Sequence, residues 1–317
     1  MGHWDAATIT LVASVVGLLT VATIVGRILS KRAKTDAARR TVDNLKARTR
    51  AWWVMAAVFG AAMAAGPAGA CVLFAFVSFV ALREVVTLTP SRRGDHHTLF
   101  WVFFVMVPVQ YWLVYRERAG LFTIFVPVYC FLFVAIRSAL SGDSRSYLER
   151  TSKIQWALFI CIYCISHAPA LLTLHIPGYE RQSWKLLVFL VVVAQMSDVL
   201  QYIWGKLLGR RKIAPTLSPN KTWEGFVGGV LTATGLGAAL APITPFKIWQ
   251  AALIALMVAL LGFFAGLVMS AIKRDAGVKD YGHLIEGHGG MMDRVDSLTF
   301  AAPIFFHVVR FFFVPPA

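Results

Sequence analysis

The amino-acid sequence predicts an all-α protein, a polytopic transmembrane helical bundle of about ten spans. Composition, long apolar stretches and the distribution of charge support this fold class. The chain has 317 residues, of which 58% are hydrophobic and 15% are charged, and its mean hydropathy is +0.66. A soluble domain has about a quarter charged residues and roughly half apolar residues. The composition therefore disfavours soluble, disordered and disulfide-bonded proteins.

Ten apolar stretches approach the roughly 20 residues that a transmembrane helix needs. The stretch 51–87 is interrupted by Gly66-Pro67, which favours two short spans over one long helix. The predicted spans are 8–29, 51–66, 69–87, 98–115, 119–138, 155–175, 185–204, 226–243, 248–271 and 298–314.

Basic residues exceed acidic residues, and the net charge is +15. In a soluble protein this excess would suggest nucleic acid, but here we expect no nucleic-acid partner. If the N-terminus lies outside, 25 of the 31 Lys and Arg residues fall in cytoplasmic segments and 5 fall on the other side. This asymmetry follows the positive-inside rule. It persists only if 51–87 forms two spans.

The chain divides into three predicted regions. Residues 1–50 contain an anchor span and a basic connector (31–50), which we expect to be helical, cytoplasmic and attracted to anionic lipid. Positive charge follows the first span instead of preceding it, so this span is not predicted to be a cleaved signal peptide. Residues 51–196 form a membrane helical bundle, and 197–317 form the C-terminal membrane region with the chemical motifs.

All acidic residues of 197–317 lie in two hydrophilic segments, 197–225 and 270–297. Carboxylates beside Lys and Arg at a membrane surface indicate a site for Mg²⁺ and phosphate groups, because Mg²⁺ usually takes one or two carboxylates plus substrate phosphates. Asp198 lies within an apolar run, where an ionisable side chain is costly and therefore suggests function. The acidic residues are Asp198, Glu224, Asp275, Asp280, Glu286, Asp293 and Asp296.

The second segment ends where the last predicted span begins. Asp293 and Asp296 are three residues apart, so on a helix they share a face. Gly289 and Gly290 allow a sharp turn that brings backbone N–H groups to a phosphate at a helix N-terminus. In the first segment, Ser218 is predicted to cap a helix whose first turn contains the following proline.

These features also have ordinary explanations. Lys273 and Arg274 are equally well explained as topology charges at a helix end. Asp293, Arg294 and Asp296 could form a surface ion-pair cluster. The functional interpretation depends on the features occurring together.

The motifs resemble the signature of the phosphatidate cytidylyltransferases, also called CDP-diacylglycerol synthases. One matching run is Ser270-x-x-Lys273-Arg274, Lys279-Asp280 and Gly287-His288-Gly289-Gly290-x-x-Asp293-Arg294-x-Asp296-Ser297. The upstream matches are Ser197-Asp198 and Ser218-Pro219-x-Lys221-Thr222-Trp223-Glu224-Gly225. The resemblance covers roughly the last 120 residues and indicates a divergent bacterial-type member.

The resemblance implies a nucleotidyltransferase of phospholipid biosynthesis. Such an enzyme joins CTP to phosphatidic acid, releases pyrophosphate and needs Mg²⁺. The implied location is the bacterial inner membrane, with the motif loops on the cytoplasmic side, membrane lipids as partners and a homodimer as a further expectation. Asp280 and Asp293 are assigned to metal, with Asp198 and Asp296 as further candidates. The expected catalytic residues are Asp280, Asp293, Ser270 and Lys273, and the expected substrate-binding residues are Ser218, Lys221, Arg274, Lys279, His288, Gly289, Gly290 and Arg294.

The sequence departs from the family pattern at several positions. Gly266 stands where the family has an acidic residue thought to help hold metal. Val199, Leu200 and Gln201 replace small residues, and Glu286 replaces a proline. The alternatives are therefore a CTP-dependent lipid or polyprenol kinase, a catalytically impaired paralogue and a lipid-transporting protein on the same bundle.

Overall fold

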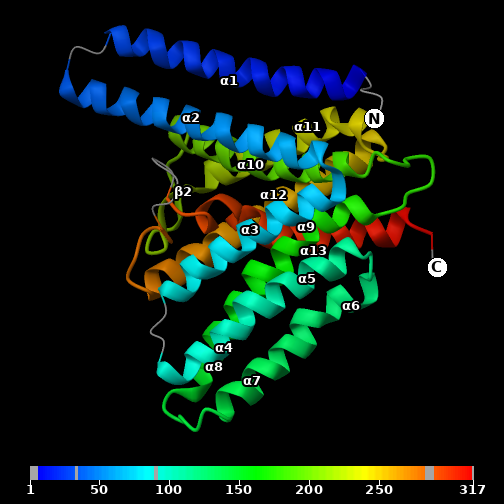
Figure 1. Ribbon diagram of the computed structural model, residues 1–317. Coiled ribbons are helices and arrows are strands. Elements are labelled where there is room, and N and C mark those ends of the chain that lie inside the picture. The colour runs from blue at the N-terminus through cyan, green and yellow to red at the C-terminus, as the bar shows by residue number, and fades with distance from the viewer. Residues whose placement is uncertain (1–5, 33–34, 89–91, 283–288, 316–317) are drawn as a thin grey trace.

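The computed structural model describes residues 6–32, 35–88, 92–282 and 289–315 (Figure 1). Helices dominate this part of the chain, and one short hairpin interrupts them. The elements are α1 (Ala6–Arg32), α2 (Asp36–Ala64), α3 (Gly66–Thr87), α4 (Arg93–Trp101), η1 (Val102–Met106), α5 (Val107–Tyr115), α6 (Ala119–Ile124), η2 (Phe125–Cys130), α7 (Phe131–Ala139), α8 (Tyr147–Leu158), η3 (Phe159–Cys164), α9 (Ile165–Ala170), η4 (Leu171–Thr173), α10 (Trp184–Leu207), β1 (Lys212–Ala214), β2 (Ser218–Thr222), α11 (Trp223–Ala239), η5 (Ala241–Ile243), α12 (Ile248–Asp275) and α13 (Met292–Phe313).

The predicted polytopic helical bundle is confirmed. Among the described residues, eight helical stretches are long and apolar enough to cross a membrane. They correspond to eight of the ten predicted spans. The other two fall in the second half of α2 and in α11, which has 17 residues. Because α2 begins at Asp36, the basic connector and the following apolar stretch form one continuous helix.

The predicted break within 51–87 is also confirmed. Gly66 has a positive φ of 71°, and Pro67 lies in the first turn of α3. A proline is tolerated there because the first N–H groups of a helix have no partner within the helix. Helices α2 and α3 therefore pack as a hairpin (Figure 1).

Three of the spans contain a π-helical segment: η1, η2 and η3. Pro108 lies in the first turn of α5, which follows η1, and Pro127 lies within η2. A proline has no N–H for the usual helical hydrogen bond, so it favours a local change of the helical pattern at these two segments. The helical axis continues through each segment into the next α-helix.

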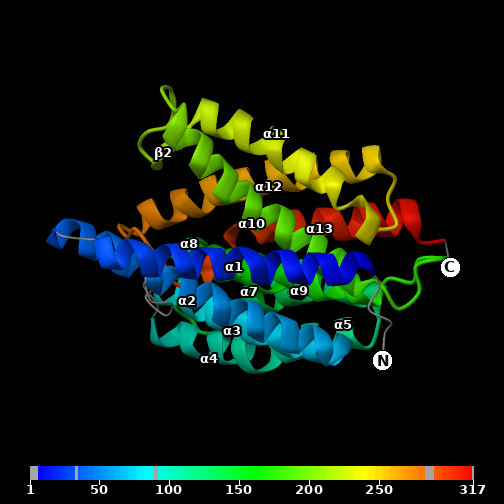
Figure 2. The ribbon, with the colours of Figure 1, turned by 90° about the horizontal axis from the view of Figure 1, so that it is seen from above.

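Helix α13 lies at the centre of the bundle. It contacts α3 and α9 on one side and α10 and α12 on the other, and the two groups of helices are separated in Figure 2. Its aromatic side chains join the core, where Phe305 and Phe306 are fully buried and Phe305 stacks on Phe189. This central position fixes the first turn of α13 relative to both groups.

The helix ends that flank the predicted cytoplasmic segments lie together at one end of the bundle. The connection between α7 and α8, the β1–β2 hairpin and the first turn of α13 all lie there (Figure 1). The start of α1 and the end of α13 lie at the opposite end. The basic segments identified from the sequence are therefore gathered in space.

The prediction that Ser218 caps a helix is wrong. Ser218–Thr222 forms β2, which pairs antiparallel with β1 through Lys212–Thr222 and Ala214–Ser218. The helix begins after this strand, and the side chain of Thr222 accepts the N–H of Gly225 at 3.1 Å. Strand pairing holds Ser218 in an extended conformation, so the next suitable hydroxyl along the chain takes the capping position.

Candidate active site

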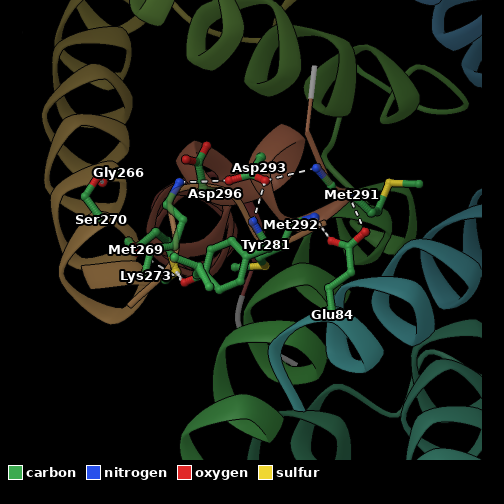
Figure 3. A network of polar contacts seen from close by, with 12 residues as sticks. Glu84, Gly266, Met269, Ser270, Lys273, Tyr281, Met291, Met292, Asp293 and Asp296 are labelled. Carbon is green, nitrogen blue, oxygen red and sulfur yellow. Dashed lines mark hydrogen bonds and ion pairs between the residues drawn. The ribbon is translucent and has the colours of Figure 1, made fainter. Parts of the chain in front are cut away.

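The predicted site residues lie on several segments that meet at one end of the bundle. The last turns of α12 face the first turns of α13, and α3 approaches from the side (Figure 3). The C-terminal half of α10 and the end of the hairpin complete the region. Among the predicted residues in this region are Asp198 on α10, Lys221 on β2, Ser270 and Lys273 on α12, and Asp293, Arg294 and Asp296 on α13.

Both carboxylate oxygens of Asp293 are bonded. The Lys273 Nζ lies 2.8 Å from Oδ1, and Oδ2 accepts the backbone N–H groups of Tyr281 at 2.9 Å and Gly290 at 3.0 Å (Figure 3). The side chains of Lys273 and Asp293 are 14% and 8% exposed. Charge-assisted hydrogen bonds of this kind are among the strongest in proteins. Asp293 on α13 therefore holds both α12, through Lys273, and the segment after α12, through Tyr281.

Tyr281 supports the same ion pair. Its ring centroid lies 5.3 Å from Lys273 Nζ, within range of a cation–π interaction. Its hydroxyl donates to the carbonyl oxygen of Met269 at 3.2 Å. Burial raises the pKa of Tyr281, so the hydroxyl remains protonated and able to donate at neutral pH.

A second cluster joins α10, β2 and α13. Asp198 and Asp296 lie close enough for their negative charges to interact, and both attract the Lys221 ammonium. Burial lowers the pKa of Lys221, and the two carboxylates act in the opposite direction. Lys273 also attracts Asp296, and Arg294 interacts with Asp296 and Asp293. The two clusters therefore form one continuous charged site.

Gly266 faces the Lys221 ammonium. A Cβ atom at residue 266 would lie 2.9 Å from Lys221 Nζ, which also lies 3.4 Å from the Phe263 carbonyl oxygen and 4.5 Å from the centre of that ring. The ammonium thus occupies space where an acidic side chain would begin in the family that the motifs resemble. Ser270 donates its hydroxyl to the Gly266 carbonyl oxygen at 2.7 Å.

The first turn of α13 is bonded to carboxylates. Gly290 donates its N–H to Asp293, and the N–H groups of Met291 and Met292 donate to Glu84 on α3 at 2.9 and 2.8 Å. The sequence predicts that such N–H groups face a phosphate. In the structure these three N–H groups donate to side chains of the protein instead.

Exposed charges lie at the outer edge of the site. Arg274 donates from Nη1 to the Val278 carbonyl oxygen at 3.0 Å and from Nε towards that of Leu217 at 3.4 Å. It thereby links the end of α12 to the loop of the hairpin. The side chains of Lys279 and Asp280 are exposed, so they remain accessible from solvent.

The remaining predicted residues are placed differently. Ser218 is half-buried in β2, and His288 lies outside the described residues. Gly289 has a positive φ of 79°, and a Cβ atom there would lie 2.9 Å from Asp293 Oδ2. The turn before α13 therefore needs glycine at this position, both for its backbone conformation and for the carboxylate beside it.

The described residues provide few ligands for a metal ion. Among residues 6–32, 35–88, 92–282 and 289–315, no group of three or more His, Cys, Asp or Glu side chains is placed to hold one. The Asp198–Asp296 pair does provide two neighbouring carboxylates. This donor set fits Mg²⁺, which usually binds one or two carboxylates together with substrate phosphates and water. Lys221, Lys273 and Arg294 partly balance the carboxylate charge.

Glu84 and Tyr281 are site residues that the sequence analysis missed. Glu84 follows Arg83 near the end of the otherwise apolar predicted span 69–87, much as Asp198 lies near the end of its own span. The rule that an ionisable residue in an apolar span suggests function would therefore have identified Glu84. Tyr281 follows Asp280 directly, but its backbone and ring contacts have no signal in the sequence.

The chain is similar to known proteins over most of its length. Residues 46–312 match the cytidylyltransferase family. The chain is 38% identical over 301 residues to the uncharacterized protein YnbB of Escherichia coli (strain K12), which covers 94% of this chain and 97% of that protein. It is also 38% identical over 130 residues to the phosphatidate cytidylyltransferase of Staphylococcus saprophyticus and 36% identical over 130 residues to that of Staphylococcus aureus (strain COL).

The two staphylococcal matches each cover 40% of this chain and 50% of the relative. The family match begins within α2, so α1 and the start of α2 lie outside it. It includes every site residue described above and most of the membrane bundle. With eight apolar helices of membrane-spanning length among the described residues, the chain is an integral membrane protein, and it belongs to the cytidylyltransferase family.

Proposed function

We propose that this protein transfers the cytidylyl group of CTP to phosphatidic acid, giving CDP-diacylglycerol and pyrophosphate. The observation that carries the proposal is the meeting of three carboxylates with two lysine ammonium groups at one end of the bundle. The carboxylates are Asp198, Asp293 and Asp296, and the ammonium groups are those of Lys221 and Lys273. Family membership and the phosphatidate cytidylyltransferases among the relatives support this reaction.

The charge of the site favours a metal–nucleotide complex over a free nucleotide. The three carboxylates are balanced by Lys221, Lys273 and Arg294, so little positive charge remains to neutralise a triphosphate. Arg274 and Lys279 lie at the exposed edge and supply further positive charge. We assign them to the phosphates of CTP, because Arg and Lys are the usual partners of phosphate oxygens.

Mg²⁺ bound between Asp198 and Asp296 would supply the additional positive charge at the phosphates. Asp293 and Asp280 remain candidates for metal binding. In the structure Asp293 is held by Lys273 and two backbone N–H groups. Its first role in the proposal is therefore to fix Lys273 beside Asp296, with Ser270 and His288 positioning the nucleotide.

The chemical step needs no covalent enzyme intermediate. A phosphate oxygen of the lipid forms a bond to the α-phosphorus of CTP. The bond from that phosphorus to the bridging oxygen of the β-phosphate breaks, and pyrophosphate leaves with the electron pair. The attacking phosphate is already negatively charged, so the protein acts by positioning the two substrates and by electrostatic stabilisation.

The arrangement of the loops supports an orientation in the membrane. The site lies at the end of the bundle where the basic segments gather (Figure 1). By the positive-inside rule this end is cytoplasmic, where CTP is present. We propose the bacterial inner membrane as the location, with the acyl chains of the lipid in the bilayer and its phosphate at the membrane surface.

The proposal is tested with purified protein, Mg²⁺ and CTP labelled at either the α- or the γ-phosphate. The acceptors are phosphatidic acid, other lipid phosphates, diacylglycerol and polyprenol. We expect the α-label in a CDP-lipid and the γ-label in pyrophosphate, and we expect Asp293→Asn to abolish this turnover. A γ-label in a phosphorylated alcohol would indicate the lipid or polyprenol kinase. Absence of labelled lipid with every acceptor would overturn the proposal and favour an impaired or lipid-transporting protein.

A further inference from the structure

Glu84 connects α3 to the first turn of α13. Its side chain is 8% exposed. Oε1 accepts the N–H of Met291 at 2.9 Å, and Oε2 accepts the N–H of Met292 at 2.8 Å (Figure 3). These partners are 207 and 208 residues away in sequence. One carboxylate thus bonds two successive amides at the start of the central helix.

The neighbouring glycines leave room for this carboxylate. A Cβ atom on Gly290 would lie 2.4 Å from Glu84 Oε2, and one on Gly282 would lie 3.0 Å from Oε1. Contacts below 3.0 Å require something to shift, so any side chain at residue 290 would displace the carboxylate. The double-glycine motif therefore has a role in the protein interior, namely the close approach of Glu84.

Three successive N–H groups are held by two carboxylates. Gly290 donates to Asp293, and the next two residues, Met291 and Met292, donate to Glu84. The turn that carries Asp293 and Asp296 is therefore fixed from α3 as well as from α12. Because α3 belongs to the N-terminal half of the chain, this contact connects the N-terminal and C-terminal halves of the bundle at the site.

We propose that Glu84 is a positioning residue, which holds the first turn of α13 in the orientation that the charged site requires. It has no substrate contact in this proposal and acts through Asp293 and Asp296. The inference rests on the proposed function for its catalytic readout. A misplacement of about 1 Å in a reacting site can reduce the rate by about 100-fold, so loss of this contact should be visible in turnover.

The test compares wild type with Glu84→Gln, which keeps the shape of the side chain. A glutamine amide has one acceptor oxygen and one NH₂ donor, so it cannot accept one N–H group on each of its two terminal atoms, as Glu84 does. Glu149→Gln is the matched control, since Glu149 is 62% exposed and pairs with Lys153 one helical turn away. All proteins are full-length and purified in the same detergent.

Hydrogen exchange of residues 289–297 gives a readout that is independent of activity. Losing a hydrogen bond to a charged group costs about 1.5–3 kcal/mol, so we expect the Met291 and Met292 amides to exchange about 10- to 100-fold faster in Glu84→Gln. We expect kcat to fall by about 100-fold, with the KM for phosphatidic acid changed less than about threefold. Glu149→Gln should match wild type in both measurements.

Unchanged exchange, or faster exchange with a kcat within about threefold of wild type, would overturn the positioning role. If Glu84→Gln does not fold, Gly290→Ala provides a second test, because it displaces the same carboxylate without changing its charge. We expect the same faster exchange and lower kcat. If wild type forms no CDP-lipid, the proposed function fails, but the positioning role is still tested by hydrogen exchange. Slower exchange of residues 289–297 on addition of Mg²⁺ and CTP in wild type, but not in Glu84→Gln, would support the positioning role, and equal slowing in both would overturn it.

Discussion

Removing the lysine of the Lys273–Asp293 pair should destabilise the protein measurably. The change is Lys273→Met, which keeps most of the length of the side chain and removes its charge. The two charged atoms are 2.8 Å apart, and the side chains are 14% and 8% exposed. Breaking a buried pair by removing one partner costs about 3–5 kcal/mol. Asp293 retains two backbone N–H donors, so we expect a smaller loss of about 2–3 kcal/mol in the free energy of unfolding.

A double-mutant cycle isolates the contribution of the pair. Asp293→Asn should cost a similar amount, because it leaves the Lys273 ammonium without its charged partner. The double variant should cost less than the sum of the single variants by about 1.5–3 kcal/mol. Free energies are measured by reversible unfolding with sodium dodecyl sulfate in mixed micelles.

The exposed pair of Lys153 and Glu149 is the control. Its charged atoms are also 2.8 Å apart, but its side chains are 35% and 62% exposed. The same cycle there should give about 0.3–0.5 kcal/mol, as for other pairs one turn apart on a helix. If the Lys273–Asp293 cycle gave an equally small coupling, burial would not strengthen this pair and the reasoning would be refuted.

Three further predictions follow from the space and charge around other residues. Gly266→Asp should lower the Mg²⁺ concentration for half-maximal turnover about tenfold, because it adds a further carboxylate beside the charged cluster; Gly266→Asn, which adds the same bulk without charge, should not, and equal effects would contradict this. Gly229→Ala should cost about 1–3 kcal/mol, because its Cβ would lie 2.3 Å from a side-chain atom of α10, whereas Gly235→Ala, with no atom within 4 Å, should unfold like wild type. A hydrogen bond from Arg150 lowers the pKa of Asp143 from 3.8 to about 2, so the difference in Tm between wild type and Asp143→Asn should be full above pH 4 and disappear as the pH falls towards 2, and a constant difference would contradict this.

Local patterns in the sequence predict most of the fold. Span positions follow from apolar length, and the break at Gly66-Pro67 follows from residues that end helices. Ser218 shows where local reasoning fails. Its capping propensity is real, but pairing between β1 and β2 extends the backbone at this residue. At Ser218 the pairing of the two strands therefore outweighs the local preference of serine for a helix cap.

The sequence also predicts most of the candidate site. Asp198 was identified because a charge in an apolar span is costly, and the structure places it beside Asp296 and Lys221. Glu84 was not identified, although the same reasoning applies to it. Its partners are backbone N–H groups more than 200 residues away, and a backbone group has no side-chain signal.

By itself, the amino-acid sequence determined the class of the protein: a membrane bundle with a cluster of phosphate- and metal-binding residue types in two segments. Hydrophobicity, charge and motif spacing are properties of short stretches, so they can be read without a fold. Only the tertiary structure decided which groups lie in contact: Lys273 pairs with Asp293, the Lys221 ammonium lies beside Gly266, and Glu84 binds the first N–H groups of α13. The physical reason is that hydrogen bonds and ion pairs act over about 3–4 Å, a distance that the packing of separate helices sets.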